Sequence, residues 1–475
     1  MRIQQFFLGG LGHQSYLICD EAAGVAAVVD PRRDIEVYLA AAEGAGTRIT
    51  HVFETHVHND YVTGALELRD RVGATIVAAA AAGVRYEHLG AREGESVSVG
   101  GMRFVALETP GHTPAHISFA LYAPESSEPH AVFTGGSMLS GNAGRTDLVS
   151  PGMTLTLTRD QYRSLRRLLD TLPDATLVYP THGAGSFCGA ASDTEPMRSS
   201  TIAQERAISP AALARDEAEF VRQQMAGYGL YPSYYNYMRD INLLGPAILG
   251  GMPEIPGLTP QQVADLLRAG IPLLDSRSRR EFARERIPDA INIEMDDSFG
   301  TYAGWLLPFN SPLTLLTSDA AERGEAVAQL VRIGYEQTRG YLDGGMEAWR
   351  AAGLPVESFE RISVKELHRR LTSAEAPAVL DVRDETEWRA GHIPGAQHIH
   401  VADLPRHLNE TPLDRPIAII CRSGHRASIA ASIVSALGRP TIAVQGGVDN
   451  WIAAGYPTAF GATGESASAL EHAHP

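Results

Sequence analysis

The chain is poor in cysteine and has no long apolar run. Its three cysteines among 475 residues, Cys19, Cys188 and Cys421, cannot build a disulfide framework, so we expect free thiols in a reducing compartment. The longest strongly apolar run, residues 76–84, is mostly alanine and falls well short of the roughly 18 to 20 residues that cross a bilayer. Residues 1–10 lack the apolar core and the cleavage site of a secretory signal. The sequence therefore predicts a cytoplasmic protein without a membrane partner.

Positive charge is also scarce. The chain carries 56 acidic and 40 basic residues, a formal net charge of −16, and no run of lysine or arginine. Such a charge repels a phosphate backbone, which excludes nucleic acid as an expected partner. At about 150 residues per domain, a chain of 475 residues predicts about three domains. The sequence leaves open whether the chain forms a homo-oligomer.

An internal repeat divides the C-terminal half. The segment LLDSRSRREFARERIPDAINI at residues 273–293 matches VLDVRDETEWRAGHIPGAQHI at residues 379–399. In both copies short apolar strands alternate with helical stretches, as in a parallel sheet with helices on its faces. The sequence predicts two tandem α/β domains, over residues 258–357 and 361–463.

The first 245 residues have a different texture, with short apolar runs separated by loops rich in glycine and histidine. We expect one α/β domain over residues 1–245. A helical segment at 209–228 and a linker rich in proline and glycine at 245–257 follow from the composition. The expected strands of this domain are residues 16–19, 25–30, 51–55, 132–134 and 177–179.

Histidines follow several of these expected strands. One strand leads into Thr55, His56, Val57, His58, Asn59 and Asp60, and two later loops carry His112 with His116, and His182. A lone histidine is more often a satisfied polar group than a ligand. Several imidazoles that gather at strand ends form a natural site for Zn or Fe, so the pattern favours a metal centre.

These residues resemble the metallo-β-lactamase superfamily, whose αββα sandwich holds metal with a THxHxDH motif, a GHT loop, an FTGD loop and a final histidine. The resemblance covers about the first 200 residues and has two departures. Tyr61 stands where dinuclear hydrolases have a second-metal histidine, and Gly136 stands where they have the bridging aspartate. A dinuclear zinc hydrolase would therefore lack two expected ligands.

The segments THVHNDYVTGALEL, GRTDL and YPTHGAGSFCG resemble the persulfide dioxygenase branch of this superfamily, including forms fused to rhodanese domains. The resemblance implies one Fe(II), with Zn as the alternative metal, and the oxidation of a small-molecule persulfide by O₂ to sulfite. His56 and His112 fall on two iron ligands, and the third is missing at Gly136. Water or another carboxylate could replace it, with Asp60 nearest in sequence. His58, Asp60 and His182 are the further candidate ligands.

Cys188 follows His182 closely in the sequence. Two interpretations are open: a thiol that touches a sulfur substrate, or a small buried apolar residue. The second is the more common use of a lone cysteine.

The residues after the apolar strand 417–420 carry the strongest chemical signal. Cys421 ends this strand, and the loop from Arg422 to Arg426 leads into a helix marked by Ile429, Ile433 and Leu437. The loop amides, the helix dipole and the two arginines should favour thiolate over thiol and accept an anion. The pattern predicts an exposed, reactive Cys421.

Loop length separates the two chemistries that use such a thiolate. Cysteine phosphatases enclose a tetrahedral phosphate in a longer loop, whereas here four residues separate Cys421 from Arg426. The loop CRSGHR and its flanking motifs resemble the rhodanese family. The resemblance implies that Cys421 carries sulfane sulfur between persulfide, thiosulfate and sulfite. The expected catalytic residues are Cys421, Arg422 and Arg426, and the expected substrate-binding residues are Ser423, Gly424, His425, Asp381 and Arg383.

The earlier repeat lacks this thiol, because Thr317 aligns with Cys421. A threonine hydroxyl cannot hold sulfane sulfur, so the domain over residues 258–357 is expected to be an inactive rhodanese-like domain. The sequence thus predicts an enzyme that joins a persulfide dioxygenase-like domain to a thiosulfate sulfurtransferase. Its alternatives are a sulfurtransferase with a non-catalytic lactamase-fold domain, a thioester hydrolase of the glyoxalase II kind, and a phosphatase at Cys421.

Overall fold

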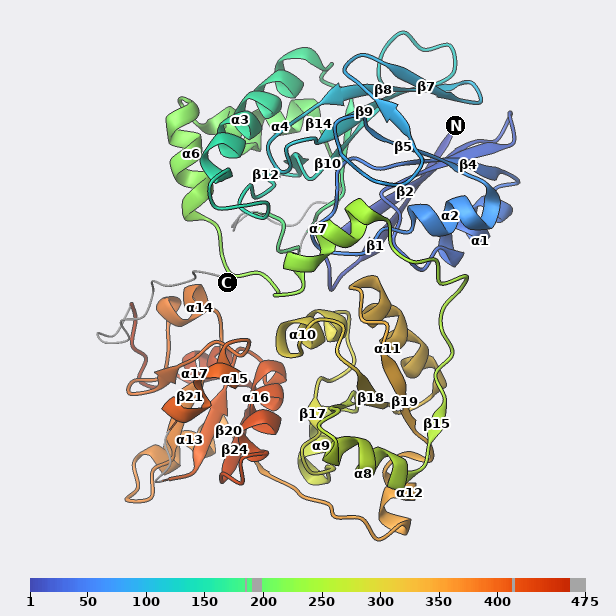
Figure 1. The fold of residues 1–475 in the computed structure, drawn as a ribbon. Helices are drawn as coiled ribbons and strands as arrows, with labels where there is room; N and C mark the ends of the chain where they lie inside the picture. The colour runs from blue at the N-terminus through green and yellow to red at the C-terminus, as the bar shows by residue number, and fades with distance from the viewer. Residues whose placement is uncertain (184–185, 190–198, 412–414, 462–475) are drawn as a thin grey trace. The chain divides into compact units, whose positions relative to one another are not determined.

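Two six-stranded sheets pack face to face in the N-terminal part of the protein, as a computed structural model shows (Figure 1). The structure describes residues 1–183, 186–189, 199–411 and 415–461. Aromatic side chains fill the space between the sheets, where the rings of Phe53 and Phe104 stack with centroids 4.2 Å apart. The first sheet runs β1 (Arg2–Leu8), β2 (His13–Asp20), β3 (Val25–Val29), β4 (Arg48–Phe53), β5 (Thr75–Ala79) and β6 (Leu89–Ala91). The second runs β14 (Ser200–Thr201), β13 (Leu177–Pro180), β10 (Ala131–Gly135), β9 (Ile117–Tyr122), β8 (Met102–Glu108) and β7 (Ser96–Val99).

Helices cover the outer face of each sheet. The helices α1 (Glu36–Gly44) and α2 (Ala65–Val72) bury Tyr38 and Leu68 against the first sheet. The long α3 (Thr154–Thr171) buries Leu165 and Leu168 against the second sheet, beside Phe220 of α6 (Glu217–Ala226). This order of layers confirms the predicted αββα sandwich. A small hairpin, β11 (Met138–Leu139) with β12 (Asn142–Ala143), and the helix α4 (Ile202–Ile208) complete this part.

The two repeats have the same strand order, and all their strand pairs are parallel. This topology confirms the predicted parallel-sheet α/β fold of both. The first sheet runs β15 (Gly257–Leu258), β19 (Thr338–Leu342), β18 (Leu313–Leu316), β16 (Leu273–Asp275) and β17 (Ile291–Asn292). The second runs β20 (Glu360–Ser363), β24 (Thr441–Gln445), β23 (Ile417–Ile420), β21 (Ala378–Asp381) and β22 (Gln397–His398).

Helices of the first repeat are α8 (Pro260–Arg268), α9 (Arg279–Arg284), α10 (Phe299–Leu306), α11 (Ala320–Arg332) and α12 (Gly345–Ala351). Those of the second are α13 (Val364–Leu371), α14 (Glu385–Ala390), α15 (Leu404–His407), α16 (His425–Ser435) and α17 (Gly447–Ala453).

The compact units of the chain do not follow the repeat boundaries. One unit comprises residues 1–254, 296–311 and 324–337, and the other comprises 255–295, 312–323 and 338–475. Within the first unit, α10 and most of α11 therefore join the N-terminal residues. The segment 258–357 contributes residues to both units.

Two expected elements differ from the structure, and one helix was not expected. The segment 209–228 forms two helices, α5 (Pro210–Leu213) and α6, because Ala214 is extended and Asp216 caps α6 by accepting a hydrogen bond from the Glu219 N–H. The unexpected helix is α7 (Tyr235–Leu244), which buries Tyr235 and Met238. The strand expected at 51–55 ends at Phe53.

None of the helices in the described part of the chain combines the length and the apolar character needed to cross a membrane.

Candidate functional site

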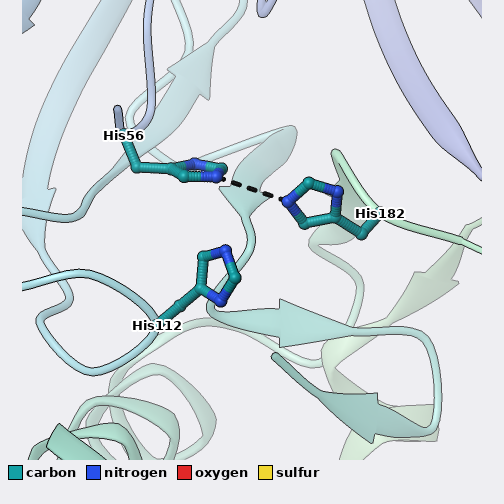
Figure 2. A group of neighbouring side chains, drawn as sticks. All are labelled: His56, His112 and His182. Carbon is teal, nitrogen blue, oxygen red and sulfur yellow. Dashed lines mark hydrogen bonds between the residues drawn. The ribbon is translucent and has the colours of Figure 1, made fainter. Parts of the chain in front are cut away.

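Three histidines from distant loops point toward one another at one end of the sandwich (Figure 2). His56 follows β4, His112 lies between β8 and β9, and His182 follows β13. The Nε2 atoms of His56 and His182 are 3.3 Å apart, and one ring nitrogen from each of the three histidines lies within 4.8 Å of the others. All three side chains are buried. The structure therefore brings together both expected iron ligands and one further candidate.

The Nδ1 atom of each ring contacts a neighbouring polar group. Thr55 Oγ1 donates to Asp30 Oδ2 (2.7 Å), so it accepts a hydrogen bond from His56 Nδ1 (2.8 Å). His112 Nδ1 donates to the carbonyl oxygen of Arg145 (2.7 Å), and His182 Nδ1 lies 3.3 Å from Asp60 Oδ2. The first two contacts are hydrogen bonds that place the ring protons of His56 and His112 on Nδ1, as in metal sites with outer hydrogen bonds.

Burial keeps the imidazoles of His56 and His112 neutral. Burial, together with the nearby His58, lowers the pKa of His56 well below its ordinary value. Burial and the nearby His182 lower the pKa of His112 to about 3. Neutral imidazole is the form that binds metal.

The residues present fit a metal ion. Nε2 of His112 is buried and has no hydrogen-bond partner among the described residues, and it faces the Nε2 atoms of His56 and His182, which lie 3.3 Å apart. Converging imidazoles with anchored Nδ1 atoms are ligands suited to Zn or Fe. The domain therefore contains the buried His/Asp metal site expected for its fold.

The Nε2 atom of His58 contacts two carboxylates and one hydroxyl. Its Nε2 lies 3.3 Å from Asp30 Oδ1, 3.2 Å from Glu54 Oε2 and 3.0 Å from the hydroxyl of Tyr61. Burial alone would lower the pKa of His58, but the two carboxylates outweigh it and raise this pKa to about 10. His58 thus binds carboxylates through Nε2, and Tyr61 packs beside it in the place where dinuclear relatives have a histidine.

Gly136 leaves no room for a side chain. A Cβ atom at this position would lie 2.2 Å from Cδ2 of His112. The Gly136 N–H donates to Nε2 of His116 (3.0 Å), which fixes the backbone there. The ring of His112 therefore fills the space that a bridging aspartate would enter.

Asp60, the expected substitute for that aspartate, lies beside Nδ1 of His182 rather than in the gap at Gly136. Burial would raise the pKa of Asp60, but the adjacent His182 outweighs this and lowers it to about 2. His58, Asp60 and His182 also offer atoms within 4.8 Å of one another, so Asp60 and His58 stay predicted metal ligands.

Sequence reasoning missed several residues around this centre. Asp30 and Glu54 hold His58, and Thr55 orients His56. Arg145, in the GRTDL segment, binds His112 through its carbonyl, and its guanidinium pairs with Asp147 at 2.7 Å. The sequence carried one signal for these residues, which is their place at the strand ends. Asp30 directly follows β3 and Glu54 directly follows β4, and His56 lies just beyond Glu54.

The structure buries Cys188 completely, with Sγ 4.0 Å from the hydroxyl of Tyr235. Burial raises the pKa of this thiol well above its ordinary value. Cys188 is therefore a protonated, buried thiol.

Cys421 lies at the end of β23, as expected, but it is not exposed. Its relative exposure is 1%, and its Sγ accepts a hydrogen bond from the Gly424 N–H (3.0 Å). Gly424 has φ +107°, a left-handed conformation that turns the loop back over the sulfur before α16 begins. The prediction of an exposed thiol is wrong because the loop backbone closes around the sulfur.

Carboxylates engage both loop arginines. Arg422 is exposed and pairs with Asp449 (3.0 Å). Arg426 pairs with Asp384 (2.9 Å) and Glu387 (2.6 Å), at the start of α14. Ser423 and His425 lie in the loop and at the first residue of α16. The catalytic and binding roles of these residues stay predictions.

Asp381 and Arg383 bind each other. Their buried ion pair has a distance of 2.7 Å, and Arg383 also donates to the Gly391 carbonyl (2.8 Å). The first repeat has the same pair, Asp275 with Arg277, although it has no cysteine. This recurrence indicates a structural role, and nothing places the two side chains on a substrate.

Comparisons with known proteins agree with this architecture. The metallo-beta-lactamase superfamily model matches residues 8–182, and the rhodanese-like domain model matches residues 259–352 and 363–454. The solved metallo-beta-lactamase from Staphylococcus aureus is 28% identical with a TM-score of 0.63, over 72% of this chain and 98% of that chain. The protein thus carries a metallo-β-lactamase domain followed by two rhodanese domains.

Curated relatives fall into two groups. The hydroxyacylglutathione hydrolase of Rhodospirillum rubrum is 36% identical over 35% of this chain and 60% of the relative. The mitochondrial persulfide dioxygenase ETHE1 of Mus musculus is 29% identical over 41% of this chain and 70% of the relative. The chain spans about 60% of the length of the hydrolases that it matches.

Proposed function

We propose that this protein oxidises a low-molecular-weight thiol persulfide to sulfite at one iron ion held by His56, His112 and His182, and that Cys421 transfers sulfane sulfur. The observation that carries the first half is the convergence of one ring nitrogen from each of three buried histidines. The likeness to a persulfide dioxygenase supports the choice of reaction.

Three histidine ligands suit this reaction. Iron would supply redox chemistry with O₂ and open positions for the persulfide. In the balanced reaction, RSSH, O₂ and H₂O give RSH, SO₃²⁻ and two protons, so four electrons pass from sulfur to O₂. Thr55, Asp60 and the Arg145 carbonyl keep the three imidazoles oriented.

The second half of the proposal concerns the Cys421 loop. The Cys421 thiolate attacks the outer sulfur of thiosulfate, the S–S bond breaks, and sulfite leaves with the electron pair while a cysteine persulfide forms. In reverse, sulfite from the oxidation takes the sulfane sulfur and leaves as thiosulfate. The Gly424 N–H, which already donates to Sγ, stabilises the negative charge on sulfur.

Oxygen uptake tests the oxidation. The purified chain loaded with Fe(II) is supplied with glutathione persulfide, and we expect one O₂ consumed per sulfite formed. His182→Gln should lower iron affinity by about 10- to 100-fold or more, measured as bound iron by metal analysis. The exposed His130→Gln is the matched control and should bind iron normally. No uptake by a fully iron-loaded protein would leave a sulfurtransferase with a non-catalytic lactamase-fold domain.

A thioester hydrolase is the second candidate, because the hydroxyacylglutathione hydrolase of Rhodospirillum rubrum is 36% identical. Tyr61 and Gly136 speak against its usual pair of metals, since the first bonds to His58 and the second has no space for a carboxylate. Two metal ions per chain together with hydrolysis of a glutathione thioester would establish this candidate instead.

A further inference from the structure

The two repeats meet inside one compact unit, through α16 of the second repeat. Asn292 of β17 accepts a hydrogen bond from Ser428 Oγ (2.6 Å), and its N–H donates to Ser432 Oγ (3.2 Å). All three residues are buried. Since Cys421 lies directly before α16, this contact fixes the first repeat beside the cysteine loop.

Arg279 of the first repeat lies against that loop. Its Nη1 is 3.5 Å from the carbonyl oxygen of Ser423, and a Cβ atom built on Gly424 would lie 3.4 Å from the same Nη1. Its Nε pairs with Glu294 (2.6 Å), which holds the side chain in place. The guanidinium thus lies along the backbone of the two residues that form the turn over the sulfur.

The charge around Arg279 is positive. Burial and the nearby Arg279 and Arg280 lower the pKa of Arg361, so three guanidinium groups share this region with Glu294. By contrast, the loop's own Arg422 and Arg426 are paired with carboxylates. Glu294 offsets one of the three charges near Arg279, so this region keeps a net positive charge that can attract a second negative charge on a sulfur donor.

We infer that Arg279 is a specificity-determining residue of the Cys421 loop: the repeat without a cysteine supplies a positive charge that binds the sulfonate end of an anionic donor such as thiosulfate. This inference rests on the proposed sulfur transfer at Cys421. The inference gives the first repeat a role in substrate selection. This repeat has no thiol, but its arginine provides a positive charge near the thiol of the second repeat.

Steady-state kinetics with two donors test the inference. Thiosulfate carries the sulfonate group, and cysteine persulfide lacks it. For Arg279→Gln we expect the KM for thiosulfate to rise about five- to tenfold, with kcat and the KM for cysteine persulfide within about twofold of wild type. Arg279→Lys should restore most of the thiosulfate affinity. Added salt should raise the wild-type KM for thiosulfate more than that of Arg279→Gln.

Arg284→Gln is the matched control, because Arg284 is an exposed arginine at the other end of the same helix. Equal KM values for thiosulfate in Arg279→Gln and Arg284→Gln would overturn the inference, and so would an equal loss with both donors, which indicates a distorted loop. Cys421→Ser separates the two proposals. If that variant still transfers sulfur, the proposed function of the loop fails; if it is inactive and Arg279→Gln behaves as wild type, only the inference fails.

Discussion

The two rhodanese repeats share a framework and differ in one loop. Both have the buried Asp–Arg pair after the second strand of the fold, and in both a tryptophan Nε1 donates to a proline carbonyl, Trp349 to Pro355 (2.9 Å) and Trp451 to Pro457 (2.8 Å). Their sheets have the same order. The framework is therefore independent of the cysteine, which lies in the loop after the central strand.

That loop is built differently in the first repeat. Thr317 donates to the carbonyl of Asp319 (3.2 Å), and the N–H of Ser318 donates to Glu322 (3.2 Å). The Glu322 carboxylate thus accepts a hydrogen bond from the Ser318 amide, which could otherwise bind an anion. In the second repeat the Gly424 amide donates to Cys421 Sγ. The residue that aligns with Gly424 is Ala320, the first residue of α11, so the two loops differ at more than the thiol position.

The largest expected effect comes from a substitution in the loop that contains Cys421. Cys421→Ser should lower thiosulfate sulfurtransfer by about 10³-fold or more, because the hydroxyl cannot form a persulfide. Thr317→Ser is the matched change in the first repeat and should leave the rate unchanged. Cyanide-dependent thiocyanate formation measures both. Phosphate-ester hydrolysis by the wild type, lost in Cys421→Ser, would instead make the loop a phosphatase site.

Loss of the shared ion pair should lower the free energy of unfolding in both repeats. Asp275→Ala or Asp381→Ala leaves a buried arginine unpaired and should cost about 3–5 kcal/mol of unfolding free energy. The cost should be higher for Asp381, since the Arg383 side chain is 4% exposed and that of Arg277 is 11% exposed. Urea unfolding measures this free energy. An intact stability with lost sulfurtransfer in Asp381→Ala would return Asp381 to the substrate-binding role.

A smaller effect is expected at the tryptophans. Trp349→Phe and Trp451→Phe each remove one hydrogen bond and part of a buried ring, which should cost about 1–3 kcal/mol. Thermal unfolding should show similar losses for the two variants. A loss confined to one repeat would show that the frameworks have diverged in stability as well as in chemistry.

The smallest effect on sulfurtransfer is expected when a cysteine alone is introduced into the first repeat. Thr317→Cys should give no measurable sulfurtransfer in a Cys421→Ser background, because Glu322 still occupies the loop amide. Thr317→Cys with Glu322→Gln is the comparison variant, and persulfide on residue 317 is detected by mass spectrometry after incubation with thiosulfate. Ready sulfurtransfer by Thr317→Cys alone would contradict the view that the whole loop has been lost.

Local patterns predicted much of this molecule. The strands at 313–316 and 417–420, the repeat and the helix after Cys421 follow from short apolar runs and helical spacing, which depend on neighbours in sequence. The convergence of histidines followed from their places after strands. The burial of Cys421, the partnership of His58 with Asp30, and the contact of Arg279 with Ser423 depend on residues far apart in the chain. Periodicity carries no information about such contacts.

The space at Gly136 bears on any attempt to engineer a two-metal hydrolase from this protein. Aspartate introduced there alone would collide with the His112 ring, whose turning aside would break its bond to the Arg145 carbonyl. Tyr61 would still hold the neighbouring position through its bonds to His58 and to the Asp30 carbonyl. A two-metal site in this protein would therefore require coordinated replacements at Gly136 and Tyr61 together with a new position for the His112 ring.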